Sequence, residues 1–222
     1  TAQAHYPWLM ASDFTPAEGR TANVFLAWGH AFPFEGFMTE DRVGSVEIVS
    51  PDGKRSALAA SGAGYVTPEL KEGGYVVLAS QKSSFYTRTK QGSKRQSKEG
   101  LNDVIRCSYS SNNMKAILTV GGEDDGKIGE SFGQPLEIIP LSDPSELQVG
   151  DYMDVKITLR NEPYSGMVYA TYAGFSTEGA YAYTVEADDG KASIRILHPG
   201  QWLVRAKVEQ AYPDPKVCDV ES

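Results

Sequence analysis

The chain has few of the residues that most often build reactive sites: its 222 residues include two cysteines and three histidines. It also lacks a Gly-x-Ser-x-Gly motif, a phosphate-binding glycine loop and a His-Glu-x-x-His motif, which are common signatures of hydrolases, nucleotide-binding enzymes and zinc proteases. No apolar run approaches the roughly 18 residues that span a bilayer, so we expect no membrane insertion. These absences favour a protein that binds a ligand over an enzyme.

The charge balance is acidic. There are 29 Asp and Glu residues against 21 Lys and Arg, a formal net charge of -8. Such a surface repels phosphate backbones, so nucleic acid is not an expected partner. Residues 90–98 are locally basic but carry no aromatic side chains on which bases could stack. We predict that they form a solvated loop.

The first residues of the sequence resemble the end of a secretory signal. Ala2-Gln3-Ala4 has the small side chains that signal peptidase requires before its cut, which predicts an exported protein. Cleavage after Ala4 would make His5 a mature N-terminus, whose free amine and imidazole could both bind one transition metal. Alternatively, cleavage lies upstream of Thr1, and His5 is an ordinary residue ahead of the first strand.

Two cysteines in an exported chain allow one internal disulfide, which an oxidising compartment favours. We therefore predict a bridge between Cys107 and Cys218. It would close a long loop and contribute about 3–5 kcal/mol to stability on the chain-entropy model. No Cys-x-x-Cys spacing is present, so the predicted role is structural.

Short β-rich runs separated by turns predict an all-β protein. Ser50-Pro51-Asp52-Gly53-Lys54 is typical of a hairpin turn, and in residues 151–159 apolar side chains (Tyr152 or Met153 first) alternate with polar ones. For residues 98–108 we expect a short helix or an ordered loop. We predict two antiparallel β-sandwich domains of immunoglobulin-like or transthyretin-like type, spanning residues 1–122 and 134–222, with a Gly/Asp-rich linker at 123–133.

Several short motifs, in this order, resemble the DUF4198 family. They are His5-Tyr6-Pro7-Trp8-Leu9, Trp28-Gly29-His30-Ala31-Phe32-Pro33, Ser84-Phe85-Tyr86-Thr87-Arg88-Thr89, Gln134-Pro135-Leu136-Glu137-Ile138-Ile139-Pro140-Leu141, Asp188-Asp189-Gly190-Lys191-Ala192 and Gly200-Gln201-Trp202-Leu203-Val204. The resemblance implies an exported two-domain β protein, periplasmic after its signal peptide is removed. It also implies a role as a component of cobalt or nickel uptake, with a metal ion and membrane components of the uptake system as partners.

Two of the three histidines lie in these motifs, and imidazole is a common ligand of nickel, cobalt, copper and zinc. We predict that His5 and His30 bind one ion, with Glu35 as an oxygen ligand; Glu40 and Asp41 follow in the same loop. The alternative is that His30, after Gly29, is a turn residue with backbone hydrogen bonds. His198 precedes Pro199-Gly200 and is predicted to be a plain turn residue.

The aromatic residues support a competing hypothesis. Trp8, Phe32, Phe34 and Phe37 could form a ligand-contact surface, because Pro33 and Gly36 keep the loop from packing as a regular strand. The protein would then be a metal-free module that binds carbohydrate, peptide or protein in the cell envelope. His30→Ala would abolish metal affinity under the first hypothesis and leave ligand binding intact under this one. A purely structural envelope protein, for which neither site matters, is the third possibility.

Overall fold

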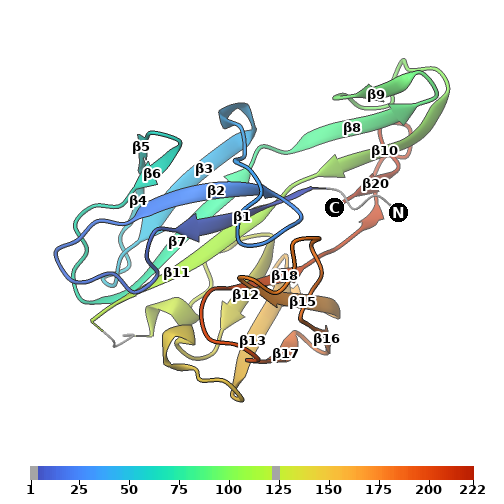
Figure 1. Cartoon of the computed structure of the whole chain (residues 1–222). Helices are drawn as coiled ribbons and strands as arrows, with labels where there is room; N and C mark the ends of the chain where they lie inside the picture. Colours follow the sequence, from blue (N-terminus) through green and yellow to red (C-terminus); the bar gives the residue numbers. More distant parts are fainter. Residues whose placement is uncertain (1–4, 122–125) are drawn as a thin grey trace.

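The computed structural model describes residues 5–121 and 126–222 and confirms the predicted all-β class (Figure 1). Five sheets, almost entirely antiparallel, make up this part of the chain, together with the short 3-10 helices η1 (Glu40–Arg42), η2 (Lys127–Gly129) and η3 (Pro144–Glu146). None of its helices has the length and apolar character needed to cross a bilayer. The predicted signal-like residues Ala2 to Ala4, the last residue of the predicted first domain and residues 123–125 of the predicted linker lie outside the described residues.

Two sheets form a sandwich in the first half of the chain. Alternation puts one face of each strand inside, so Leu9, Val24, Val77 and Leu118 meet in a common core between the sheets. One sheet has the order β1-β2-β6-β5 and the other β11-β7-β3-β4. Their strands are β1 (Tyr6–Ala11), β2 (Asn23–Gly29), β3 (Val43–Val49), β4 (Arg55–Ala57), β5 (Ala59–Ser61), β6 (Gly64–Val66), β7 (Gly73–Gln81) and β11 (Asn113–Val120).

The turn predicted at residues 50–54 connects two paired strands, as expected. β3 and β4 are antiparallel, with Val49 opposite Arg55. The Ser50 N–H donates to the carbonyl of Lys54 (3.0 Å), and Gly53 has φ +81°, a conformation that glycine adopts without strain. The turn residues are therefore a sufficient signal to predict this hairpin from the sequence.

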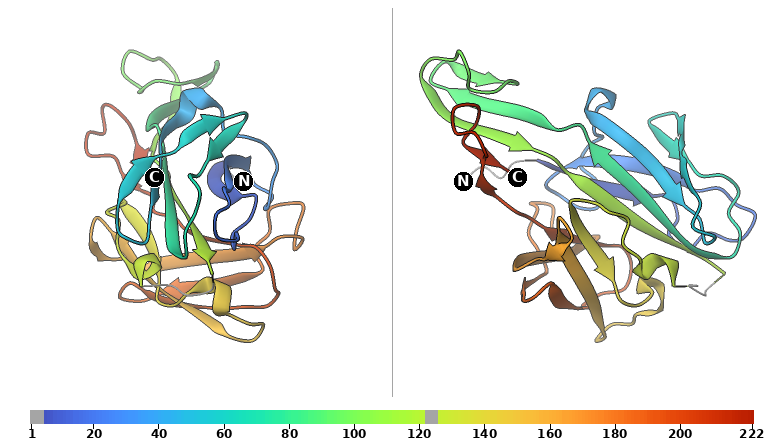
Figure 2. Two further views of the ribbon diagram at one scale, coloured as in Figure 1. Left: turned by 90° about the vertical axis from the view of Figure 1, so that its left-hand side faces the viewer. Right: turned by 180° about the vertical axis from the view of Figure 1, so that it is seen from behind.

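A long arm projects from this sandwich (Figures 1 and 2). It is a five-stranded sheet in the order β19-β20-β10-β8-β9, made of β8 (Ser84–Thr89), β9 (Gly92–Lys94), β10 (Val104–Ser110), β19 (Gln210–Ala211) and β20 (Val220–Glu221). The predicted Cys107–Cys218 disulfide is present, is fully buried and ties the end of the chain to β10. The last strands thus belong to the arm and not to the sheets that precede them in sequence.

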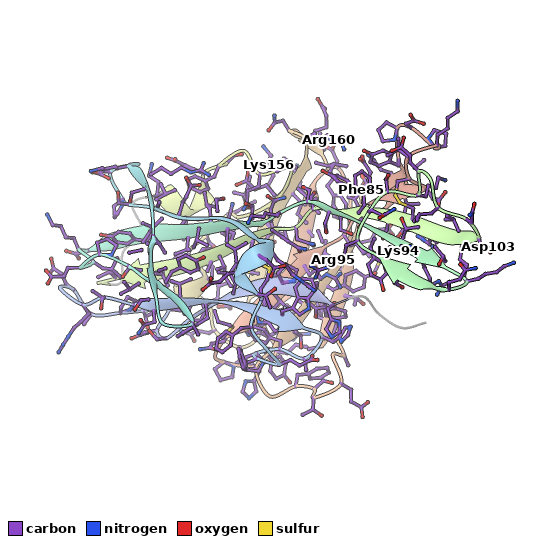
Figure 3. The ribbon with its side chains drawn as sticks, turned by 90° about the horizontal axis from the view of Figure 1, so that it is seen from above. Phe85, Lys94, Arg95, Asp103, Lys156 and Arg160 are labelled. Carbon is purple, nitrogen blue, oxygen red and sulfur yellow. A yellow bond between two sulfur atoms is a disulfide. The ribbon has the colours of Figure 1, made fainter. Side chains whose placement is uncertain are left out.

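The arm corrects one sequence prediction. For residues 98–108 the sequence predicts a short helix or an ordered loop; residues 98–103 are indeed a loop, but strand β10 begins at Val104 and pairs with β8. Its β-branched residues favour a strand, and the partner strand supplies the backbone hydrogen bonds. The basic segment 90–98 is mostly exposed, as predicted, but it contains the short strand β9 and is not loop throughout. Lys94 and Arg95 are labelled in Figure 3. Arg95 Nη1 lies 3.3 Å from Asp41 Oδ2.

A second sandwich follows in the sequence. Its core lies between two sheets, with Val155 and Ile157 from one sheet packed near Val168 and Ala170 from the other. Met153 is the buried residue of the predicted alternating strand, whereas Tyr152 is exposed. The strands are β12 (Leu136–Pro140), β13 (Tyr152–Leu159), β14 (Glu162–Pro163) and β17 (Lys191–Arg195) in one sheet, and β15 (Gly166–Tyr172), β16 (Tyr183–Ala187) and β18 (Trp202–Ala206) in the other.

The two sandwiches pack on one another through several contacts, which include an apolar cluster and a buried ion pair. Tyr6, Trp8 and Phe32 form a small buried cluster against which Ala173 and Leu203 of the second sandwich pack. Lys115, on the outer face of β11, forms an ion pair with Glu137 of β12, with 2.7 Å between Nζ and Oε1. The first contact lies directly beside the predicted metal ligands.

Candidate metal centre

The register of β1 and β2 brings the two predicted histidines together. The strands are antiparallel with Tyr6 opposite Gly29, so His5 just before β1 lies beside His30 just after β2. Their ring centroids are 4.2 Å apart. The sequence spacing of 25 positions carries no sign of this contact; strand pairing creates it.

Glu35 reaches the same place because it folds back over its own loop. Its Oε2 accepts hydrogen bonds from the backbone N–H groups of His30 (2.6 Å) and Ala31 (3.0 Å). These two bonds lower the pKa of the Glu35 carboxyl below its ordinary value. The other oxygen, Oε1, lies 3.8 Å from Nε2 of His5. An ionised carboxylate, bonded through Oε2 to the loop backbone, therefore lies beside the two imidazoles.

Gly29 makes this arrangement possible. Its φ is +155°, and a Cβ at this position would lie 2.5 Å from Oε2 and 2.7 Å from Cβ of Glu35. Real Cβ atoms do not approach other atoms so closely, so any other residue would push Glu35 away from the His30 N–H. Gly29 is thus part of the site although it offers no ligand atom.

The loop that carries His30 and Glu35 is anchored to β1 by two side chains. The Tyr6 hydroxyl donates to the His30 carbonyl (3.1 Å), and the Trp8 indole N–H donates to the Pro33 carbonyl (2.9 Å). Burial raises the pKa of Tyr6 above its ordinary value, and its contact with Tyr181 adds to this effect. The loop backbone is therefore held in place before any ligand arrives.

The donor set suits a transition metal. Ligand atoms of His5, His30 and Glu35 all lie within 4.8 Å of one another. Metal–nitrogen and metal–oxygen bonds of about 2.0–2.2 Å put ligands of one ion about 3–4 Å apart, so a small rotation of the exposed His5 and Glu35 side chains would close the site. Two imidazoles and a carboxylate, without thiolate, fit nickel, cobalt, copper or zinc.

The other predicted candidates lie outside this group. Asp41 is paired with Arg95, and a hydrogen bond from Thr39 lowers the pKa of its carboxyl; Glu40 begins η1. The His198 ring stacks on Tyr172 at 4.7 Å, and its Nδ1 hydrogen-bonds to the Pro199 carbonyl (2.6 Å). His198 is therefore held in a turn, as predicted.

The predicted aromatic surface needs correction. Phe34 and Phe37 are exposed by 49% and 47% and meet edge to face at 4.8 Å. Trp8 and Phe32 are buried in the cluster between the sandwiches, because each packs against apolar side chains on the inner side of the loop. Phe25, which lies 6.1 Å from Phe37, is the further aromatic neighbour of this surface.

Sequence reasoning missed three neighbours of the site. Trp28 stacks beside the His5 ring at 6.1 Å. Gly179 and Arg205, from the second sandwich, lie against His30 and Tyr6, respectively. Such contacts between distant segments leave no local signal in the sequence.

A cleft of about 610 Å³ lies between the sandwiches, next to but separate from the metal group. Its walls are largely apolar and include Leu9 and Met114 from the first sandwich and Leu136 and Val204 from the second. This volume falls within the range of small-molecule sites, which is about 300–1,000 Å³.

Fold and site together define an all-β protein of two sandwiches with a candidate His/His/Glu metal centre at their junction. The family model described as a domain of unknown function, DUF4198, matches residues 2–210, nearly the whole chain. The chain therefore belongs to the DUF4198 family. No curated protein matches it.

Proposed function

We propose that this protein is a periplasmic binding protein that carries a divalent transition metal, cobalt or nickel, for an uptake system. It binds the ion as cargo and does not transform it. The observation that carries the proposal is the convergence of His5, His30 and Glu35, whose ligand atoms lie within 4.8 Å of one another. The Cys107–Cys218 disulfide supports an oxidising compartment such as the periplasm.

The openness of the site favours transport over a structural role. The side chains of His5 and Glu35 are 51% and 41% exposed, so an ion can reach them from solvent. Structural metal sites are closed by four protein ligands, whereas three protein ligands leave a position for water or for a ligand of a partner. Such a position allows an acceptor protein to bind the ion before this protein releases it.

Processing could supply a fourth ligand. If the mature chain begins at His5, its amine would lie next to the imidazole of the same residue and could complete the site. This part of the proposal concerns residues 1–4, which lie outside the described residues.

Calorimetric titration of Ni²⁺, Co²⁺, Cu²⁺ and Zn²⁺ tests the proposal, with the N-terminus fixed by mass spectrometry at Thr1 or at His5. We expect one ion per chain, with affinity at least tenfold weaker in His5→Ala and His30→Ala. His198→Ala is the matched control, because it removes an imidazole held in a turn elsewhere, and it should bind as the unmodified chain does. Absence of binding in both forms of the chain would refute the proposal. Binding by the His5 form alone would assign the amine as a ligand.

The exposed pair Phe34 and Phe37 favours a second candidate function, a metal-free module that binds carbohydrate, peptide or protein. Large exposed aromatic side chains that pack on one another commonly mark a binding surface. A screen of glycans and peptides would test it. Under this function Phe34→Ala and Phe37→Ala lose binding while His30→Ala keeps it, and the opposite pattern would exclude it.

A further inference from the structure

A loop of the second sandwich, residues 174–181, packs directly on His30 of the candidate metal centre. A Cβ built on Gly179 would lie 2.7 Å from the His30 carbonyl oxygen and 3.0 Å from the His30 Cβ. Gly179 also has φ +75°, a conformation that favours glycine. Only a residue without a side chain allows the loop to approach His30 this closely.

The loop is itself well ordered by local hydrogen bonds. The Ser176 hydroxyl accepts the N–H groups of Glu178 (3.0 Å) and Ala180 (3.2 Å). The Thr171 hydroxyl donates to the Ala180 carbonyl (3.3 Å), which fixes the loop to the end of β15. Gly179 is therefore presented to His30 by a preformed turn.

A second contact from the same sandwich is made with Tyr6, the residue that bonds to the His30 carbonyl. Arg205 of β18 lies over the Tyr6 ring, with its guanidinium carbon 3.9 Å from the ring centroid, and also donates to the Tyr181 hydroxyl (2.8 Å). Tyr6 in turn holds the His30 carbonyl. The His30 carbonyl thus has Gly179 of the second sandwich and Tyr6 of β1 against it, and Arg205 of the second sandwich contacts Tyr6.

We propose that loop 174–181 is a positioning element of the metal centre, so that metal binding and docking of the second sandwich on His30 are thermodynamically coupled. The inference rests on the proposed function. Metal geometry tolerates errors of only about 0.5 Å in its ligands, so a shift of the His30 backbone weakens binding. By linkage, the metal must stabilise the docked loop by the same factor by which the loop strengthens metal binding.

The chain offers a matched pair of glycine substitutions for the test. Gly179→Ala adds a methyl group against His30, whereas Gly174→Ala in the same loop, at φ +89°, has no atom within 4 Å of the new Cβ. Both substitutions carry a similar backbone cost. A difference between the metal affinities of the two variants therefore reports the contact of residue 179 with His30. We expect Gly179→Ala to weaken Ni²⁺ and Co²⁺ binding at least tenfold and to alter the visible spectrum of bound Co²⁺. Gly174→Ala should stay within twofold of the unmodified chain.

Two further measurements cover the case in which Gly179→Ala fails to fold. Tyr181→Phe removes one hydroxyl that Arg205 contacts, and we expect about threefold weaker metal binding. In the unmodified chain, saturating metal should slow amide hydrogen exchange in residues 174–181 about tenfold, with no change in the distant hairpin β5–β6. A loop with a merely structural role would not respond to the metal in this way.

The outcomes separate this inference from the proposed function. Metal binding by the unmodified chain with equal affinity in all three variants, or with no change in exchange of the loop, would overturn the coupling and leave the metal centre in place. A chain that binds none of the metals would overturn the proposed function, and the coupling with it.

Discussion

Removal of the buried carboxylate of Glu137 should destabilise the protein far more than removal of an exposed one. Glu137 is 1% exposed and accepts four hydrogen bonds. Oε1 accepts from Lys115 Nζ (2.7 Å) and the Phe132 N–H (2.8 Å), and Oε2 accepts from the Ser131 hydroxyl (2.7 Å) and the Gly133 N–H (3.1 Å). These bonds fix the segment before β12 to strand β11.

The expected loss of stability depends on the buried charge that the substitution leaves without a partner. Glu137→Ala leaves the Lys115 ammonium, which is only 10% exposed, without its counter-ion. Removing one partner of a buried pair costs about 3–5 kcal/mol, a large part of the 5–15 kcal/mol that stabilises a typical domain. Glu137→Gln keeps an acceptor oxygen but loses the charge, so we expect about half of that loss.

The pH dependence of this effect has a definite sign. Burial by itself raises the pKa of Glu137, but the bonds from Lys115, Phe132 and Ser131 outweigh it and leave the pKa below its ordinary value. A carboxyl with a lowered folded-state pKa stabilises the protein above its unfolded pKa of about 4.3 and loses this contribution as pH falls further. The difference between the unmodified chain and Glu137→Gln should therefore be constant above about pH 5 and shrink below about pH 4.

Urea unfolding monitored by circular dichroism measures these differences. Glu47→Ala is the control, because Glu47 pairs with Arg55 at 2.6 Å on the surface of β3 and β4, where such pairs contribute about 0–1 kcal/mol. A loss in Glu137→Ala no larger than in Glu47→Ala would refute the reasoning. The double variant Lys115→Met/Glu137→Leu should recover part of the lost stability. Burial lowers the pKa of Lys115, which means that its charge is costly to bury, and apolar side chains at both positions avoid this cost.

Three further predictions concern the disulfide and the metal centre. Cys107→Ser/Cys218→Ser opens a loop with a sequence separation of 111 and should lower the free energy of unfolding by about 3–5 kcal/mol, measured in urea, with metal affinity unchanged; equal stability with and without the bridge would contradict this. Gly29→Ala should displace Glu35 and weaken metal binding at least tenfold by calorimetry, whereas Gly19→Ala, at φ +74° with no atom within 4 Å of the added Cβ, should not. Trp28 stacks beside His5, so Cu²⁺ should quench tryptophan fluorescence in the unmodified chain and much less in Trp28→Phe; equal quenching in both would place the ion elsewhere.

Local patterns in the sequence are sufficient to predict many of the strands and turns of the fold. Residues close together in the sequence predict the hairpin at residues 50–54 and the alternation in residues 151–159. Both are present in the structure. The loop prediction is wrong from Val104 to Ser108, because β10 depends on pairing with β8 and β20, which are distant or later in sequence. Pairing partners of this kind decide secondary structure without altering local composition.

The sequence could predict which residues are suitable metal ligands, but not that they lie close together. His5, His30 and Glu35 were chosen for their chemistry, but their proximity depends on the register of β1 and β2. The burial of Trp8 and Phe32 could not be foreseen, because the second sandwich covers the inner side of their loop. The contact of Gly179 with His30 joins segments about 150 positions apart, and a glycine before a short strand usually marks only a turn.

The disulfide changes what a break in the backbone would do. Cys107 lies before the linker between the sandwiches and Cys218 lies near the last residue, so a protease cut between residues 121 and 133 would yield two fragments that stay covalently joined. The nicked protein would keep its mass, apart from one added water, until a reductant separated the pieces. Reduction, and not cleavage, would then be the step that allows the second sandwich to leave the first.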